Sequence, residues 1–411
     1  MKILWIINKI MPYPANKLGL NKNHLGGWLD NLMEMLSKTS NIELGVVSFY
    51  SGDSLFKCQE DNTTYYLIPH KNPTKYNKKT SKYWLEINND FCADIIHIHG
   101  TEYPLGLECM ETLKNKKYII SLQGFTKSCS DLYYGGMNYK EILKNMTIRD
   151  LLRRDTIFDA KRKFKKRSQY ENRMINMSNY VIGRTDWDYS NALAINPRLK
   201  YYHLDETIRN EFYNHNWDYS KIEKNSLIVS QGYYPLKGLH QLIKALNIVS
   251  KDYPNFKLYV TGINQFQRNT IMQKIKATGY SKFILSLIKK YKLEDNIEFT
   301  GMLNEKELIK LMLKTHIMVV PSIVENESNA LTEAHIIGVP SIVAFSGGMT
   351  NRIEHKKTGF AYPFYEYTML ATYIKEYFSN NTICEKFSKE AKKIALARNT
   401  KNIDKLIYIY E

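Results

Sequence analysis

Short apolar runs alternate with amphipathic stretches along the first half of the chain. The runs that predict buried strands cover residues 2–7, 42–49, 94–100, 117–122 and 180–184. After the first run and a polar loop, the pair Gly26 and Gly27 opens a stretch from Leu29 to Leu36 whose apolar residues share one face of a helix. A strand, a glycine-containing loop, a helix and a second strand, in that order, are typical of the start of a doubly wound α/β domain.

The same alternation resumes after residue 226. Strands are predicted at 227–230, 257–260 and 296–300, and helices at 239–246 and 304–313. Residues 206–225 have no clean periodicity, which indicates a linker. Because 411 residues exceed one ordinary hydrophobic core, we predict a Rossmann-like N-terminal domain over 1–205 and a Rossmann-like C-terminal domain over 226–395.

The stretch Pro321–Pro340 places two carboxylates across a predicted strand-to-helix turn. Residues 317–320 predict a buried strand, and a helix opens near Asn329, so that Glu325 falls in the loop and Glu333 lies about one turn into the helix. The first N–H groups of a helix lack partners within it and suit a phosphate, while carboxylates accept hydrogen bonds from sugar hydroxyls. The pattern suits a nucleotide sugar, and an ordinary surface loop is the alternative.

Two glutamates at this spacing, followed by SIVAFSGGM and HKKTGF, resemble the signature of family-4 retaining glycosyltransferases of the GT-B fold (glycosyl transferases group 1). The resemblance implies two Rossmann-like doubly wound domains facing a central cleft, with the donor held by the second domain and the acceptor by the first. It implies that a last helix, at 396–411, packs back on the N-terminal domain. In the family, the residue matching Glu325 contacts the donor sugar and the residue matching Glu333 binds the nucleotide ribose. The backbone of Asn329, Ala330 and Leu331 would hold the diphosphate.

The resemblance assigns further donor-side positions. Lys237, in the turn GYYPLKG, matches a family lysine that grips the diphosphate, so we predict that it acts in catalysis together with the first glutamate. The arginine that relatives carry in the same turn is missing, because residues 231–233 occupy its place. Gly301 matches backbone that meets the nucleobase, and Gly26 and Gly27 match a loop that faces the donor phosphates.

Four polar residues near strand ends of the first domain are candidates for the cleft and the acceptor: His99, Gln123, Arg184 and Asp186. Gln123 stands where many relatives carry a histidine next to the reacting sugar. Because glutamine does not titrate, a proton-transfer role is not expected there. The pair His97 and His99 has no acidic or cysteine partner at ligand spacing, which favours a structural histidine over a metal ligand. We predict no metal.

The charge balance of 58 Lys and Arg against 41 Asp and Glu, a net +17, favours an anionic partner. Residues 137–177 are predicted to be helical and very basic. Six of the basic residues form a predicted membrane patch: Lys161, Arg162, Lys163, Lys165, Lys166 and Arg167. Clusters of this kind recognise anionic lipid headgroups, although most charge runs are solvated faces. No run approaches a transmembrane span, and the five cysteines predict neither a disulfide framework nor a zinc site.

These observations lead to one function and two alternatives. The resemblance implies a retaining hexosyltransferase that uses a UDP- or GDP-sugar without a metal cofactor. The predicted acceptor is a lipid-linked saccharide in bacterial surface polysaccharide synthesis, and the predicted location is cytoplasmic, with peripheral attachment to the inner face of the plasma membrane as a further hypothesis. We expect no nucleic-acid partner. The alternatives are a basic, non-catalytic membrane- or nucleic-acid-binding protein on the same scaffold and a nucleotide-sugar epimerase.

Overall fold

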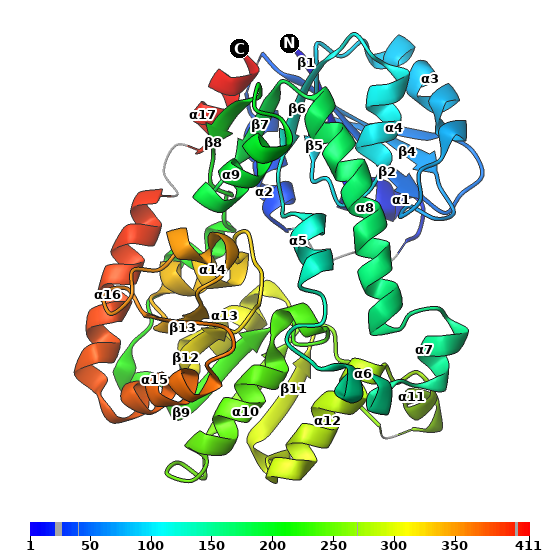
Figure 1. Ribbon diagram of the computed structural model, residues 1–411. Coiled ribbons are helices and arrows are strands. Elements are labelled where there is room, and N and C mark those ends of the chain that lie inside the picture. The colour runs from blue at the N-terminus through cyan, green and yellow to red at the C-terminus, as the bar shows by residue number, and fades with distance from the viewer. Residues whose placement is uncertain (21–26, 40, 269, 399–401) are drawn as a thin grey trace. The chain divides into compact units, whose positions relative to one another are not determined.

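The structure is a computed structural model that describes residues 1–20, 27–39, 41–268, 270–398 and 402–411 (Figure 1). The chain divides into two units, and it passes between them more than once. Unit 1 comprises Met1–Lys127, Phe164–Arg209 and Asn399–Glu411, and unit 2 comprises Ser128–Lys163 and Asn210–Arg398. Each unit is built around its own sheet.

Unit 1 contains, among the described residues, an eight-stranded sheet in the order β3-β4-β2-β1-β5-β6-β7-β8. The strands are β1 (Lys2–Ile6), β2 (Glu43–Tyr50), β3 (Phe56–Glu60), β4 (Thr63–Pro69), β5 (Ile95–His99), β6 (Lys117–Ser121), β7 (Tyr180–Gly183) and β8 (Lys200–His203). Every pair is parallel except β3 with β4. The chain builds outward from β1 on one side and from β5 on the other, as in a doubly wound fold.

Helices cover both faces of the unit 1 sheet. They include α1 (Pro12–Lys17), α2 (Gly27–Ser37), α3 (Ser81–Phe91), α4 (Leu105–Thr112), α5 (Thr126–Asp131), whose last residues belong to unit 2, α9 (Asp186–Ile195) and α17 (Asn402–Tyr410). Strand β1 has an apolar side chain on each face, because Leu4 belongs to one core cluster and Trp5 to the other. The second cluster includes Tyr410 of α17, which ties the terminal helix to this unit.

Unit 2 contains a described sheet of six parallel strands in the order β11-β10-β9-β12-β13-β14. The strands are β9 (Glu223–Ser230), β10 (Lys257–Thr261), β11 (Ile297–Gly301), β12 (Thr315–Val320), β13 (Ser341–Ala344) and β14 (Phe360–Tyr362). Its helices include α10 (Leu239–Val249), α11 (Ile271–Ile275), α12 (Gly279–Tyr291), α13 (Glu305–Lys314), α14 (Asn329–Ile337), α15 (Tyr367–Ser379) and α16 (Asn381–Arg398). The predicted fold class, α/β with two doubly wound domains, is therefore confirmed.

The segment Ser128–Lys163 differs from the prediction in two ways. It belongs to unit 2, although the sequence placed all of 1–205 in one domain. It is also divided into α6 (Tyr139–Asn145), α7 (Ile148–Leu152) and the start of α8 (Ile157–Met177), where one continuous helical stretch was expected. The breaks occur because Thr147 caps the start of α7 and Thr156 bonds Asp159 at the start of α8. The apolar periodicity alone did not reveal these caps.

Candidate active site

A cavity of about 200 Å³ opens in unit 2 at the carboxyl ends of β9 and β12. The chain runs from β9 to β11 toward one edge of the sheet and from β12 to β14 toward the other, so these two strands meet at the topological switch point, where open α/β sheets bind ligands. The lining residues are Ser230, Gln231, Lys237, Met318, Val319, Val320, Pro321, Ser322, Glu325, Glu327, Ser328, Asn329 and Ala330.

An ion pair stands in this cavity between two of the predicted site residues. The Nζ atom of Lys237 lies 2.5 Å from Oε1 of Glu325, and both side chains are mostly buried. Burial alone would lower the pKa of the Lys237 ammonium, but the Glu325 carboxylate outweighs burial and the pKa is raised. The lysine therefore keeps its charge at neutral pH, as a group that stabilises an anion must.

Two glycines fix the backbone on either side of this pair. Gly238 follows the lysine with φ +69°, and a Cβ atom there would lie 1.8 Å from the carbonyl oxygen of Pro321, so only glycine fits. A Cβ atom at Gly347, with φ +56°, would lie 2.2 Å from the carbonyl oxygen of Glu325, and the N–H of Gly348 donates to the same oxygen at 2.8 Å. The SGG sequence after β13 thus holds the loop that carries the glutamate.

Helix α14 begins at the wall of the same cavity. Ser328 is its N-cap and accepts from the N–H of Leu331 at 3.3 Å, one residue earlier than the start that the sequence indicated. The Oδ1 atom of Asn329 is buried and has no hydrogen-bond partner among the described residues. The unpaired first N–H groups and the positive end of the helix dipole suit an anion at this position.

Other predicted donor-side residues lie outside the lining of this cavity. Leu331 and Glu333 are buried further along α14. Gly301 ends β11 with φ +79°, and nothing stands within 4 Å of the position its Cβ would take. Gly27 is the first residue of α2 in unit 1, and Gly26 lies outside the described residues.

Two further residues lie in the cavity region, of which sequence reasoning missed Glu327 and noted Gln231 only as part of residues 231–233. Glu327, between the two predicted glutamates, accepts a salt bridge from Nη2 of Arg352 at 3.0 Å, and the two side chains are 2% and 6% exposed. Gln231 directly follows β9 in the left-handed region, with φ +59°, at the place where relatives were expected to carry an arginine. A non-glycine residue in this conformation is strained, and such strain gathers at functional sites.

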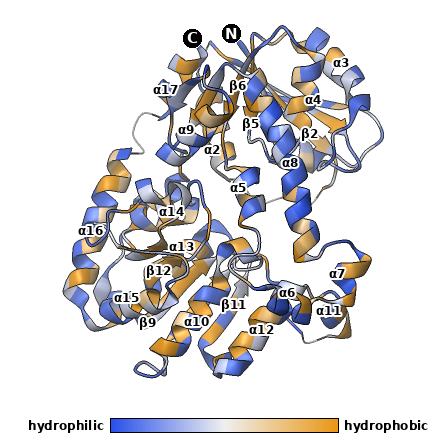
Figure 2. Ribbon diagram, in the orientation of Figure 1, coloured by the Kyte–Doolittle hydropathy of each residue, from blue (hydrophilic) through white to orange (hydrophobic). Residues whose placement is uncertain are grey.

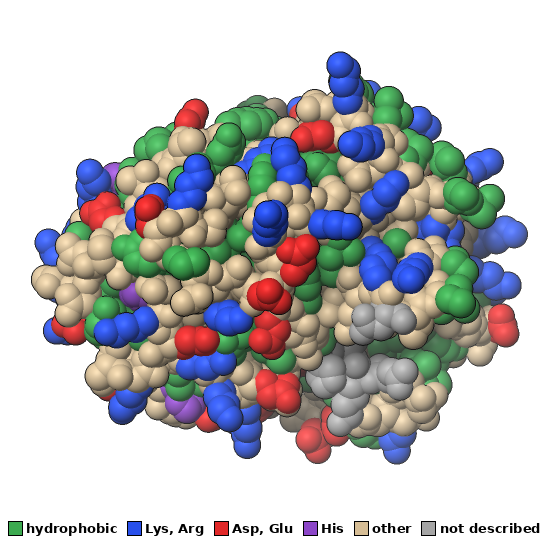
Figure 3. All heavy atoms as spheres, turned by 90° about the horizontal axis from the view of Figure 1, so that it is seen from below, with side chains coloured by type: hydrophobic (Ala, Val, Ile, Leu, Met, Phe, Trp, Pro, Cys, Tyr) green, Lys and Arg blue, Asp and Glu red, His purple; other side chains and the backbone are tan. Residues whose placement is uncertain are grey.

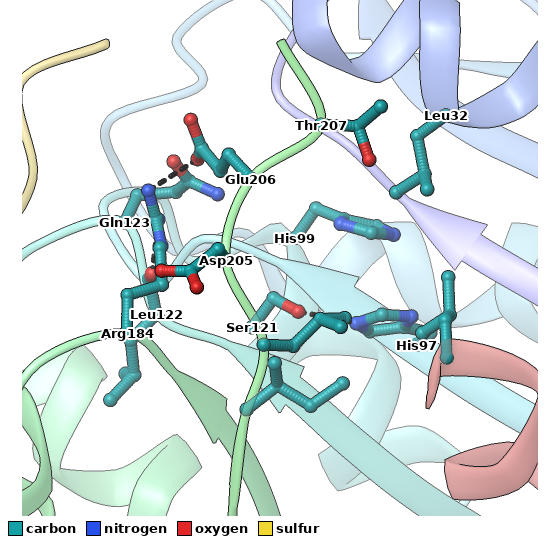
Figure 4. A pocket seen from close by; sticks show the side chains of 13 residues that line it. Leu32, His97, His99, Ser121, Leu122, Gln123, Arg184, Asp205, Glu206 and Thr207 are labelled. Carbon is teal, nitrogen blue, oxygen red and sulfur yellow. Dashed lines mark hydrogen bonds and ion pairs between the residues drawn. The ribbon is translucent and has the colours of Figure 1, made fainter. Parts of the chain in front are cut away.

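Unit 1 has a smaller pocket of about 30 Å³, which brings together three of the four acceptor-side candidates, His99, Gln123 and Arg184 (Figure 4). Figure 4 shows the Arg184 guanidinium pointing toward Glu206, and their Nη1 and Oε1 atoms are 2.5 Å apart. The same guanidinium donates to the Leu122 carbonyl. The fourth candidate, Asp186, is the exposed first residue of α9 and does not line this pocket.

The two histidines of this pocket are neutral at physiological pH. Burial lowers the pKa of His97 to about 3, and burial with the nearby His97 and Arg184 lowers that of His99 well below its usual range. The two nitrogens of His97 lie 2.6 Å from the Tyr410 hydroxyl and 2.7 Å from the Ser121 hydroxyl. Within the described part of the chain, no group of three His, Cys, Asp or Glu residues is arranged to hold a metal ion.

Comparison with known protein families matches one part of the chain. The sequence model of the family described as Glycosyl transferases group 1 matches residues 215–394, which include the whole of the unit 2 cavity. Residues 215–394 belong to that family. The predicted resemblance to glycosyl transferases group 1 is therefore confirmed for this part of the chain.

A curated relative of this chain is WcaL of Salmonella typhimurium, whose name assigns it provisionally to colanic acid biosynthesis as a glycosyltransferase. The two are 24% identical over 177 residues, which are 41% of this chain and 40% of WcaL. Across the four curated relatives that match, the aligned part spans 29% to 40% of the relative's length.

Solved structures extend the likeness in fold to the whole chain. Sucrose-phosphate synthase from Thermosynechococcus elongatus has a TM-score of 0.73 at 13% identity, covering 100% of this chain and 98% of that one. Anabaena HepE, crystallised with UDP and glucose, has a TM-score of 0.68 at 14% identity, covering 100% and 99%. Both are similar in fold, and the chain has the GT-B fold.

Four of the six residues in the predicted membrane patch on α8 have partners, although Arg162 and Lys163 stay exposed while paired. Lys163 pairs with Asp155 at 3.2 Å and Arg162 with Asp159 at 3.6 Å. The Lys161 ammonium lies over the Tyr134 ring, and the Arg167 guanidinium lies over the Phe164 ring. Lys165 and Lys166 are exposed. Of the helices that the structure describes, none is sufficiently long and apolar to cross a membrane.

Proposed function

We propose that this protein is a glycosyltransferase that moves a hexosyl group, with retention of configuration, from a UDP- or GDP-sugar to an acceptor hydroxyl. The observation that carries the proposal is the charged Lys237–Glu325 pair beside the start of α14, in a cavity at the switch point of unit 2. The group 1 domain supports a nucleotide sugar as the donor, and so does the similarity in fold to HepE, which was crystallised with UDP and glucose.

The residues of the cavity suit the separate parts of such a donor. In the reaction, the bond from the anomeric carbon to the diphosphate oxygen breaks, the oxygen of the acceptor hydroxyl forms the new bond, and the proton of that hydroxyl passes to the departing diphosphate. Lys237 and the first N–H groups of α14 stabilise the negative charge that develops on the departing diphosphate. Glu325 accepts hydrogen bonds from hydroxyls of the transferred sugar, and Glu333 accepts them from the ribose.

The acceptor side is proposed to lie in unit 1, with His99, Gln123 and Arg184 as candidates for its recognition. A lipid-linked saccharide of bacterial surface polysaccharide synthesis fits the net charge of +17, which favours an anionic membrane surface, and the pathway in the name of WcaL supports it. The protein would then act at the cytoplasmic face of the membrane.

A panel of UDP- and GDP-sugars tests the proposal. The donor is expected to raise the melting temperature of the protein, since a ligand that binds only the folded state stabilises it. With an acceptor glycolipid present, the same donor should release nucleoside diphosphate, and NMR of the product should show the anomeric configuration of the donor. Binding without turnover on any acceptor would favour a non-catalytic protein, and inversion at the anomeric carbon would exclude the retaining mechanism.

A further inference from the structure

Exposed apolar side chains gather on three short helices of unit 2, α6, α7 and α11. We call the following residues the apolar tip: Leu143, Ile148, Leu151, Leu152, Ile271, Met272 and Ile275, which are between 57% and 80% exposed. Ile148, Leu151 and Leu152 share one side of α7, and Ile271 and Ile275 share one side of α11. Figure 2 shows both helices with much of their surface hydrophobic.

Two hydrogen bonds attach α7 to the part of unit 2 that follows α11. The buried carboxylate of Asp150, in the capping box of α7, also accepts from the N–H of Gly279 at the start of α12, at 2.7 Å. The hydroxyl of Thr147 donates to the carbonyl of Ala277, between α11 and α12, at 3.0 Å. These two hydrogen bonds therefore hold α7 in place, with its apolar side chains exposed to solvent.

Basic residues surround the apolar tip, and within the described residues 139–154 and 270–282 no acidic residue is exposed. Asp155, the next residue, is paired with Arg149 and Lys163. The exposed basic residues of the same segments are Lys140, Lys144, Arg153, Arg154, Lys274, Lys276 and Lys282. Of the two acids in 139–154, Asp150 is buried and Glu141 bonds the N–H of Asn138 in a capping box, while 270–282 contains no acid. On the right-hand side of Figure 3, where α7 and α11 lie in Figure 1, hydrophobic and basic side chains adjoin with few acidic ones.

We propose that the apolar tip is the part of this protein that enters a membrane, with its Leu, Ile and Met side chains among the lipid headgroups and its Lys and Arg side chains on their phosphates. This pairing of an apolar side with a basic border is the chemistry by which proteins lie in an anionic bilayer interface. The inference rests on the membrane-bound acceptor of the proposed function, and it names the surface that reaches the membrane.

A second copy of the chain fits the apolar tip less well than a membrane does. Two copies meeting there would bring two basic borders together, and each chain carries a net charge of +17. Some of the predicted patch on α8 is paired at the surface, as for Lys163 with Asp155, and the described residues 157–167 carry no exposed large apolar side chain. We therefore expect the apolar tip, and not the α8 patch, to decide membrane binding.

The test compares the wild-type protein with the triple variant Ile148→Ser/Leu152→Ser/Ile271→Ser on sedimenting vesicles of phosphatidylcholine with phosphatidylglycerol. The matched control is Leu85→Ser, which removes an exposed leucine of α3 that lies outside the apolar tip. The partition coefficient of the triple variant between vesicles and water should be at least about tenfold lower than that of the wild type. Three apolar side chains that would be buried in the bilayer are replaced by polar ones. Leu85→Ser should bind as the wild type does.

Two further measurements separate this inference from the proposed function. The affinity for UDP and the melting temperature of the triple variant should equal those of the wild type, which shows that unit 2 is folded. Vesicle binding needs no sugar donor, so a protein that binds vesicles but transfers no sugar would contradict the proposed function alone. The inference would be overturned if the wild-type protein stayed in solution with anionic vesicles, or if the triple variant still bound them. It would also be overturned if the wild-type protein were a dimer and the triple variant a monomer.

Discussion

The cavity of unit 2 and the pocket of unit 1 both lie at the carboxyl ends of parallel strands, but their charged side chains are paired differently. The cavity lies at the ends of β9 and β12, and the pocket lies at the ends of β5, β6 and β7. The unit 2 cavity, of about 200 Å³, leaves the Lys237–Glu325 pair facing an open volume. In the pocket of about 30 Å³, Arg184 is occupied by Glu206 and the Leu122 carbonyl.

This difference indicates a division of labour. A preorganised cation beside an open cavity is suited to stabilise charge that develops on a bound ligand. A buried, internally paired arginine next to two neutral histidines instead offers hydrogen bonds of fixed direction, which suit the recognition of uncharged hydroxyls. The comparison predicts that substitutions in unit 2 change charge stabilisation and that those in unit 1 change stability and selection of the acceptor.

The largest expected effect is on the buried pair of Glu327 and Arg352. Arg352→Met leaves a carboxylate that is 2% exposed without this partner, so we expect the free energy of unfolding to fall by about 3–5 kcal/mol. The double variant Glu327→Met/Arg352→Met should recover most of that loss, because an apolar pair replaces the ion pair. Urea unfolding of both variants measures this, and a loss under about 1 kcal/mol for Arg352→Met would show that the pair is not stabilising the loop.

Lys237→Ala should produce the next largest effect, a reduction in turnover of about 10²–10³-fold, the range seen when one preorganised donor is removed. The exposed lysine Lys251 of the same unit supplies the control, since Lys251→Ala should leave turnover unchanged. Initial rates at saturating donor give the comparison. A reduction under about threefold would mean that other groups hold the departing diphosphate.

A third effect concerns a buried acid of unit 1. Burial raises the pKa of Glu171 to about 7, even though its carboxylate accepts bonds from Thr101 and Thr126. The folded protein then keeps the proton of Glu171 between pH 4.5 and 7 while the unfolded chain loses it, so the stability it contributes is present below pH 4.5 and lost as pH rises through 7. The full change corresponds to about 3 kcal/mol.

Urea unfolding from pH 5 to 8 tests this, with Glu171→Gln as the reference. The difference between the two proteins cancels the titration of other groups, such as the buried His97. Wild-type protein should lose stability relative to Glu171→Gln as the pH rises. An identical pH dependence in both proteins would show that Glu171 is already ionised at pH 5 in the folded state.

Much of the fold could be predicted from the sequence because apolar runs indicate buried parallel strands, as Ile317 to Val320 do within β12. Strands β3 and β4 were not predicted, and β4 shows why, since its buried Thr63 and Thr64 dilute the apolar signal. The Lys237–Glu325 pair joins residues that local motifs had already singled out.

Contacts between residues that are far apart in the sequence could not be predicted from it. Glu327 and Arg352 are far apart in sequence, and nothing local marks either as a partner. The attachment of α6 and α7 to unit 2 depends on Asp150 meeting the backbone of Gly279, a contact that no periodicity encodes. Sequence patterns report which face of an element is apolar, whereas the partner of a buried charge is fixed only by the packed structure.

The smallest expected effect separates the two glutamates of the group 1 domain. Glu333→Ala should weaken the binding of free nucleoside diphosphate about tenfold, the loss of one or two hydrogen bonds to a charged group. Glu325→Gln should leave the affinity for free nucleotide within about twofold, because free nucleotide lacks the transferred sugar that this carboxylate is proposed to contact. The same variant should lower turnover, because the carboxylate also faces the Lys237 ammonium. Calorimetry with UDP or GDP measures the first effect and a transfer assay the second. Equal losses of nucleotide affinity in the two variants would contradict the assignment, because both carboxylates would then bind the nucleotide. Another residue of the cavity would have to contact the sugar, and Glu327 would be the first to test.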